Sequence, residues 1–116
     1  VYSGWVYVRP GAQKTDAMQT SRNIVLSERA KADAIPNLEI EANDVKCGHA
    51  ASVGPVDDEA IFYLQSRGIS REAARGLLTY AFASDLVQKL KVAPVRISLE
   101  AFLHDRLTSL PKEAVA

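Results

Sequence analysis

The segment DVKCGHAASVGPVDDEAIFYL, residues 44–64, contains the change of pattern that decides the fold. Before Pro55, β-branched and aromatic residues alternate with polar ones in short runs, which is the period-two pattern of strands. After Pro55, apolar residues recur every three or four positions, which is typical of helices. The sequence therefore predicts a mixed β+α fold, with a β domain over residues 1–55 and a helical domain over residues 56–116.

The β half is punctuated by turn residues rather than by tight hairpin signals. Pro10-Gly11, Ile35-Pro36-Asn37 and Asn43-Asp44 are typical of turns. They separate four expected strands, at residues 2–8, 23–26, 38–40 and 45–53. Strands at such intervals suit the rungs of a parallel β-helix, in which each turn stacks on the next, and they also suit a small sandwich. Periodicity leaves both architectures open.

The helical half carries recognisable start and stop signals. Asp57 and Asp58 suit the N-cap and first turn of a helix, and Gly68 suits the left-handed position that ends it. Ser70 is expected to cap a second helix, and Pro94 to begin a third. We expect about three helices. Apolar stripes are predicted to form their inner faces: Ala74, Leu77, Leu78, Ala81, Phe82 and Leu86 on the second, and Val95, Leu99, Phe102, Leu103, Arg106 and Leu110 on the third.

Composition excludes several classes of partner. The chain has 116 residues, of which 14 are basic and 14 acidic, so its formal net charge is zero. No charged tract indicates a nucleic-acid or membrane-surface partner, and no apolar run approaches membrane-spanning length. A single cysteine fits a reducing compartment. The first residues, VYSGWVYV, lack signal-peptide features and begin inside a strand pattern, so we expect the chain to be cut from a longer one.

Cys47 and His49 are the first candidates for chemistry. In an extended strand, residues two apart point to the same side, so both could face one ligand. A closed metal site takes about four ligands, and no second Cys–His pair exists in the chain. A metal site completed by another subunit stays open. The alternatives are a small buried thiol, or a metal- or thiol-dependent enzyme that uses Cys47 and His49. The enzyme predicts rapid alkylation of Cys47, but the pair lacks an obvious third group to orient the imidazole, although Asp44 is close in sequence.

Two longer stretches carry a family resemblance: GAQKTDAMQTSRNIVLSERAKADAIPNLEIEANDVKCGHAASVG and DDEAIFYLQSRGISREAARGLLTYAF. Together and in this order they resemble the carboxy-terminal part of the SufD branch of the SufB/SufD family, scaffold components of the SUF iron–sulfur cluster assembly machinery. The SufB branch has a Thr-Gln-Cys element near Ser21 and a glutamate-rich element around residues 45–50, and this chain has neither. Family members often have glycine after the histidine, where Ala50 stands here.

The resemblance implies the end of a right-handed parallel β-helix, finishing near Gly54, followed by a helical C-terminal domain. It implies a non-catalytic scaffold. His49 would lie near the contact with SufB, where it would handle iron or a nascent cluster and serve as an intersubunit metal ligand, with Cys47 beside it. The ATPase SufC would dock on the helical domain. The implied docking residues are Phe62, Tyr63, Arg67, Ile69 and Phe82.

No cofactor is expected to bind this chain alone. Iron or an Fe–S cluster is expected only transiently at the intersubunit site, and reduced flavin only in the intact complex, since no residue here indicates a flavin site. The implied location is the bacterial cytoplasm or the plastid stroma. A third hypothesis is a β-helix oligomerisation module, because an open β-helix end can pair with a second copy.

Overall fold

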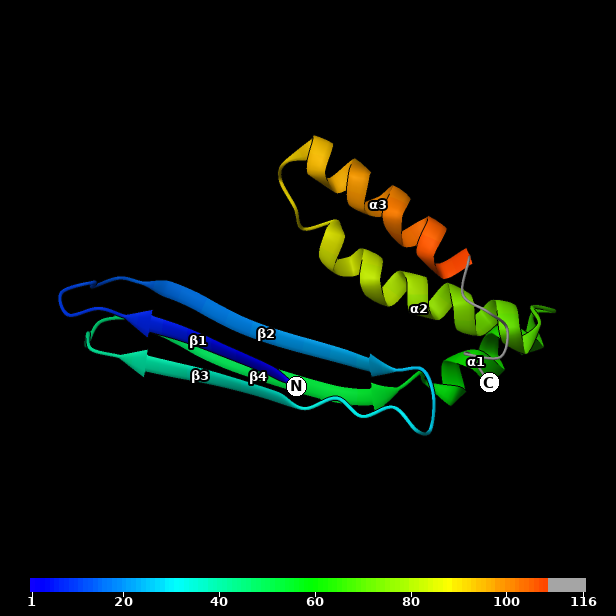
Figure 1. Cartoon of the computed structure of the whole chain (residues 1–116), viewed down its shortest axis with the longest axis horizontal. Helices are drawn as coiled ribbons and strands as arrows, with labels where there is room; N and C mark the ends of the chain where they lie inside the picture. Colours follow the sequence, from blue (N-terminus) through cyan, green and yellow to red (C-terminus); the bar gives the residue numbers. More distant parts are fainter. Residues whose placement is uncertain (109–116) are drawn as a thin grey trace. The chain divides into compact units, whose positions relative to one another are not determined.

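The computed structural model describes residues 1–108, and the chain divides into two compact units, Val1–Gly54 and Pro55–Ala116. The first unit contains four long strands and the second contains three helices (Figure 1). A mixed β+α fold is therefore confirmed. No helix within residues 1–108 combines the length and the apolarity needed to cross a bilayer.

The strands of the first unit pair as two parallel ladders. They are β1 (Tyr2–Val8), β2 (Asp16–Val25), β3 (Ala34–Ile40) and β4 (Lys46–Pro55). Strand β1 pairs with β3 and β2 with β4, so each strand skips its neighbour in sequence. Tyr2 lies beside Ala34 and Val8 beside Ile40, which gives a repeat of 32 residues. Parallel pairing argues against the antiparallel sandwich that the sequence left open.

The register of β2 with β4 follows from three contacts. The backbone N–H of Lys46 donates to the carbonyl of Thr15 at 2.8 Å, which places Lys46 beside Asp16. A Cβ built on Gly48 would lie 3.1 Å from Cε of Met18. Further along, Nδ2 of Asn23 donates to the carbonyl of Ser52 at 3.2 Å. The contacts advance in the same direction on both strands, so this ladder is also parallel, with a repeat of 30 residues.

Strand β2 begins at Asp16, seven residues before the predicted start at residue 23. As far as Asn23, its less exposed positions are Ala17, Gln19, Ser21 and Asn23, which are small or polar; Ile24 and Val25 follow. An inward face of this kind produces no alternation of apolar with polar residues. The hydrophobic pattern therefore reveals only the last part of the strand.

Strand β3 runs through Pro36, where the sequence predicted a turn. The carbonyl of Asp33 accepts from Tyr2 at 2.7 Å, and the N–H of Glu41 donates to Val8 at 2.8 Å, so odd-numbered residues of β3 bond to β1. The nitrogen of Pro36 therefore faces the opposite edge, where no ladder bond to β1 is lost. Proline is tolerated in a strand at such an edge position.

The first helix forms where the sequence predicted it. Helix α1 (Asp58–Ser66) begins after Asp57, whose carboxylate accepts from the N–H of Glu59 at 2.9 Å. It ends at Gly68, which has a φ of +86°. The N–H of Gly68 donates to the carbonyl of Gln65 at 3.0 Å, and that of Ile69 to Leu64 at 3.2 Å. These two bonds are the Schellman arrangement, which satisfies carbonyls at the helix end.

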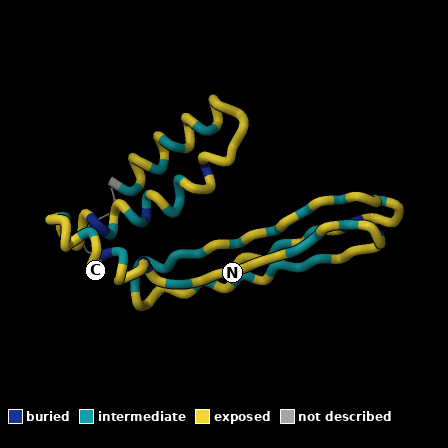
Figure 2. The backbone as a smooth tube through the Cα atoms, turned by 180° about the vertical axis from the view of Figure 1, so that it is seen from behind, coloured by how far each residue is buried: buried dark blue, intermediate teal, exposed yellow. Residues whose placement is uncertain are grey.

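Helices α2 (Arg71–Val87) and α3 (Ala93–Thr108) follow, with α1 packed on α2 and α2 on α3. The hydroxyl of Ser70 accepts from the N–H of Ala73 at 3.2 Å, which confirms the predicted cap. The core of this unit is small, and dark blue marks few places on its tube (Figure 2). Its buried residues are Val56, Ile61, Ala74, Thr79 and Val87.

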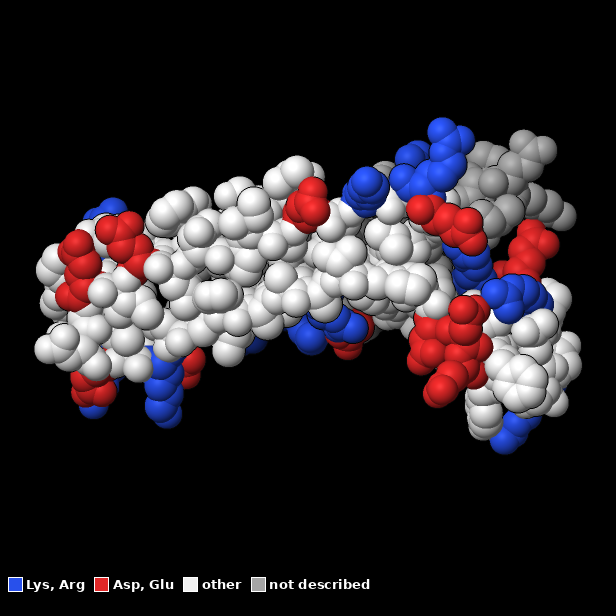
Figure 3. Space-filling model, turned by 90° about the horizontal axis from the view of Figure 1, so that it is seen from below, with Lys and Arg blue, Asp and Glu red and all other residues white. Residues whose placement is uncertain are grey.

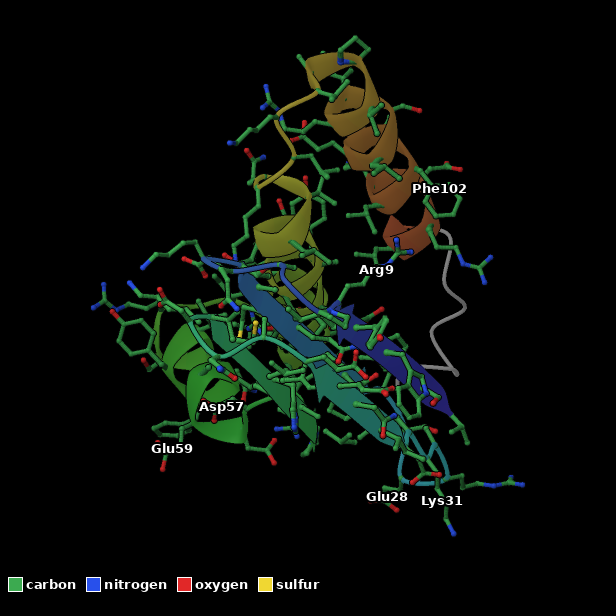
Figure 4. All side chains as sticks on the ribbon, turned by 90° about the vertical axis from the view of Figure 1, so that its left-hand side faces the viewer. Arg9, Glu28, Lys31, Asp57, Glu59 and Phe102 are labelled. Atoms are coloured by element: carbon green, nitrogen blue, oxygen red, sulfur yellow. The ribbon has the colours of Figure 1, made fainter. Side chains whose placement is uncertain are left out.

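The predicted inner faces of α2 and α3 are partly wrong. Leu86 is 71% exposed and Leu77 is also exposed, whereas Thr79 and Val87 are buried instead. On α3, Phe102 is 62% exposed and points away from the ribbon of its helix (Figure 4). Val95 and Leu99 are exposed as well, and Leu110 lies outside the described residues. The three helices form a row that encloses few side chains, so a wide apolar stripe stays partly uncovered.

Candidate functional site

Cys47 and His49 lie on β4, the last strand before the helices. Cys47 is a free, half-buried thiol, and His49 is exposed. Because the N–H of Lys46 points to β2, backbone groups of even-numbered β4 residues face β2 and those of odd-numbered residues face the other edge. The backbone N–H and C=O of Cys47 and His49 are therefore directed to an edge that no described strand occupies.

The neighbours of these residues on β2 follow from the register. Ala17 lies beside Cys47, Met18 covers Gly48, and Gln19 lies beside His49. Ala50 is part of extended β4 and is not among the described residues with positive φ, so the methyl group causes no backbone strain there. Residues of the same face thus bring together a thiol, an imidazole and a side-chain amide.

Metal-binding capacity within this group is limited to two strong ligands. Among residues 1–108, no cluster of three or more His, Cys, Asp or Glu side chains could hold a metal ion. Imidazole and thiolate both bind iron, and thiolate is the usual ligand of iron–sulfur species. The pair can therefore contribute two ligands to a site.

The second candidate group lies on α1 and exposes two aromatic rings. Phe62 is 73% exposed and Tyr63 is 56% exposed. Arg67, one helical turn after Tyr63, donates from Nη2 to the Tyr63 hydroxyl at 2.8 Å. Its guanidinium also lies 4.9 Å from the centroid of the same ring. The two contacts restrain a long, flexible cation at the surface and lower the entropy lost when a partner binds it.

Ile69 and Phe82 are placed differently from the α1 residues. Ile69 is half-buried directly after the end of α1, and its backbone is held by the bond to Leu64. Phe82 is half-buried on α2. Three of the candidates are exposed at α1 and its C-cap, namely Phe62, Tyr63 and Arg67. The other two, Ile69 and Phe82, are half-buried.

Charges near α1 are of both signs. Asp57 and Glu59 lie at the beginning of the helix (Figure 4). Asp58 forms a salt bridge with Arg71 of α2 at 2.9 Å. Figure 3 shows acidic and basic side chains near one another on the visible face. Acidic side chains at the positive end of a helix are stabilising, so a structural role explains this group.

Gln19 and Met18 were missed by the sequence analysis. They lie 30 residues before their partners on β4 and carry no spacing signal that connects them with Cys47 or His49. Only a known repeat length would have revealed the pairing.

Comparison with known proteins identifies the family. The model of the SUF system FeS cluster assembly SufBD core domain matches residues 1–82. The chain belongs to the SufBD family. Its resemblance to SufD is confirmed: it is 42% identical to the iron–sulfur cluster assembly protein SufD of Escherichia coli over 107 residues, which cover 92% of this chain and 25% of that protein.

Other SufBD relatives come from distant organisms. The SufD protein of Bacillus subtilis is 40% identical over 92% of this chain and 24% of its own length. The chloroplastic protein ABCI7 of Arabidopsis thaliana is 40% identical over 83% of this chain and 20% of its own length. The chain thus spans about a quarter of the length of these relatives.

Proposed function

We propose that this SufBD-family chain is part of a non-catalytic, SufD-like scaffold subunit that takes part in iron–sulfur cluster assembly. One observation carries the proposal. His49 lies on the outermost strand of a parallel ladder, with its backbone directed to an unoccupied edge of the described unit. The chain also resembles SufD over most of its length.

The two parallel ladders support a β-helix. Strands two apart in sequence pair with repeats of 30 and 32 residues, as successive turns of a coil do. Parallel crossovers are almost always right-handed. The proposal is that β1–β2 and β3–β4 belong to two successive turns of a right-handed β-helix, and that β3 and β4 form its terminal edge.

SufB is the proposed partner at this edge. On β3, the nitrogen of Pro36 faces outward and supplies no donor, which weakens strand addition there. On β4, proline is absent before Pro55, and odd-numbered residues offer both backbone groups. A strand of SufB would add along β4, in the mode of β-augmentation. His49 would then lie at the contact and bind iron or sulfur cargo, with Cys47 as a second ligand.

SufC is the proposed partner of the helical unit. Phe62 and Tyr63 supply apolar area, and Arg67 supplies a restrained cation for a carboxylate of the partner. Ile69 and Phe82 support this surface from its packed side. ATP-driven dimerisation of SufC would pull on the helical units and rearrange the contact that holds His49.

Flavin is expected only in the intact complex. The N-termini of α1 and α2 are the places where helix dipoles would favour a phosphate. Both are capped by side chains and carry acids in the first turn, Asp58 and Glu59 on α1 and Glu72 on α2. These carboxylates disfavour a flavin phosphate at these two helix ends.

The bacterial SufD proteins and the chloroplastic relative support a location in the bacterial cytoplasm or the plastid stroma.

A titration of the full-length gene product with SufC tests whether SufC binds at α1 while His49 acts at a separate site. We expect Phe62→Ala and Arg67→Glu to weaken SufC binding at least tenfold, and His49→Ala to leave it unchanged. Cluster assembly with SufB and SufC should instead be lost in His49→Ala. Unchanged SufC affinity in both α1 variants would contradict the docking surface.

Two rival functions are separated by further readouts. An oligomerisation module predicts self-association that does not respond to SufC. A thiol enzyme predicts rapid alkylation of Cys47 in the isolated protein. The scaffold proposal expects slow alkylation, since Cys47 is half-buried.

A further inference from the structure

Only one of the two polar atoms of the Gln19 side-chain amide has a hydrogen-bond partner among the described residues. Its Nε2 donates to the hydroxyl of Tyr2 at 3.2 Å. Its Oε1 is buried and has no hydrogen-bond partner among the described residues. Buried acceptors almost always make a hydrogen bond, so an exception needs an explanation. Part of the explanation is the orientation of the amide. The hydrogen bond to Tyr2 directs the Gln19 nitrogen to β1 and leaves the Gln19 oxygen available to another side chain.

Gly4 keeps this orientation possible. A Cβ at position 4 would overlap Nε2 of Gln19 and would lie 2.8 Å from Cζ of Tyr2. Only glycine leaves room for the amide and the phenol ring to meet over β1. The local structure is therefore built around the Gln19 side chain, although that side chain uses only one of its two polar atoms.

His49 is the neighbour that can use the free oxygen. The register places Gln19 beside His49, and paired residues in a parallel ladder point to the same face. Neighbouring strands lie about 4.8 Å apart, within reach of two long side chains. Neutral imidazole always carries one N–H donor and one acceptor nitrogen. Oε1 and the imidazole do not bond in the structure, so this hydrogen bond requires a rotation of the exposed His49 side chain.

Two competing partners have to be weighed. Ser21 lies two positions along the same strand, and its hydroxyl accepts from Nδ2 of Asn23 at 3.1 Å and keeps its O–H, but its short side chain makes no hydrogen bond to Oε1. An ion arriving from solvent cannot reach Oε1 directly, because that atom is shielded. A side chain on the adjacent strand, such as that of His49, is close enough to reach it.

We propose that Gln19 is a positioning residue for His49, accepting one ring N–H so that the other ring nitrogen presents its lone pair to iron cargo. This inference rests on the proposed function of His49 in cargo handling. Histidine ligands of metals usually donate their second N–H to such a partner, which fixes the tautomer and strengthens the ligand. The proposal does not require Gln19 to contact the cargo.

The test is imidazole nitrogen NMR on the iron-free, full-length gene product with ¹⁵N-labelled histidine, the His49 signals being assigned with His49→Asn. We expect the wild type to show one dominant tautomer. Gln19→Met, which keeps length and removes the acceptor, should give the averaged signals of a free imidazole. Gln19→Glu, which restores an acceptor, should recover one tautomer. Gln65→Met on exposed α1 is the matched control and should change nothing.

Iron retention separates this inference from the proposed function. In the complex with SufB, Gln19→Met should weaken Fe²⁺ binding by about tenfold, as partner mutations at metal-binding histidines commonly do. An unchanged tautomer in Gln19→Met would overturn the inference, even if His49→Ala abolishes iron binding. Tautomer loss in Gln19→Met with iron binding intact in His49→Ala would support the hydrogen bond and overturn the role of His49.

Discussion

The β unit and the helical unit are specified in different ways. Both ends of α1 and the beginning of α2 are marked by a residue within a few positions, namely Asp57, Gly68 and Ser70. In the first unit, strand positions are set by ladders between residues 30 or 32 positions apart. Local signals can be read from sequence, and long-range register cannot.

The two units also differ in where their stability comes from. The helical unit has a few fully enclosed side chains, of which Ile61 is 2% exposed. The interior of the β unit combines buried Val8 and Ala42 with glycine, small and polar side chains, and backbone hydrogen bonds join its strands. Side-chain truncation should therefore be most damaging in the helices, and added bulk should be most damaging between the strands.

The largest effect is expected for Ile61→Ala. It removes the most enclosed large side chain of the helical unit and leaves a cavity between α1 and α2. We expect a loss of about 3 kcal/mol in the free energy of unfolding, measured by chemical denaturation. Phe62→Ala is the adjacent control and should change it by less than about 0.5 kcal/mol, because the ring is exposed. Equal losses of unfolding free energy in the two variants would contradict the difference in burial between the two faces of α1.

The next effect concerns the interior of the β unit. Gly4→Ala places a methyl group against Gln19 and Tyr2, and both side chains have to move. We expect destabilisation by about 1.5 kcal/mol and loss of the Gln19–Tyr2 hydrogen bond. Gly54→Ala is the control on β4, since nothing lies within 4 Å of its added Cβ. If the two variants behave alike, the interior is not as closely packed as the register implies.

A smaller effect is expected at the beginning of α2. Ser70→Ala removes the hydroxyl that accepts from Ala73, which should cost about 1 kcal/mol in unfolding free energy. Ser70→Asp restores an acceptor and should recover most of the loss. Full stability in Ser70→Ala would show that packing, rather than the cap, determines where α2 begins.

The smallest effect is electrostatic. The Tyr7 hydroxyl donates to Oε2 of Glu41 at 2.8 Å, and this hydrogen bond, with some burial and the charges of Glu41 and Glu39, raises the pKa of Tyr7 above 10.0. The protonated phenol is favoured in the folded state. Its small stabilising contribution is therefore complete below pH 10 and disappears as the pH rises through the folded pKa.

Absorbance titration of the phenolate checks this prediction. Glu41→Gln should lower the pKa of Tyr7 towards the ordinary tyrosine value, because the charge beside the phenolate is removed. Glu39→Gln should lower it less, since Glu39 is the weakest of the contributing causes. The reverse order would contradict the geometry at this end of β1.

Part of this account could be predicted from sequence. Strand β1 was predicted with its observed bounds, and the caps of α1 and α2 were predicted because capping is a short-range hydrogen bond. The start of β2 was missed because its inward residues are polar, and β3 because Pro36 faces outward from its ladder. Leu86 and Phe102 were expected in the core, but the three helices enclose few side chains and leave both exposed.

The candidate site shows the same limit. Cys47 and His49 stand out as chemistry-bearing residues two positions apart, so sequence was sufficient to choose them. Gln19 becomes visible only when β2 is set beside β4. The exposed pair of Tyr63 and Arg67 could be suspected from helical spacing, but the 2.8 Å bond between them needed coordinates.

The most direct test of the central claim is the affinity of the full-length gene product for SufB when Ala51 is replaced by proline. Ala51 is an odd-numbered residue of β4, so the substitution removes an N–H from the outer edge and keeps the ladder to β2. We predict that Ala51→Pro binds SufB at least tenfold more weakly and binds SufC normally. A SufB affinity equal to that of the wild type would contradict strand addition along β4 and with it the placement of His49 at the contact.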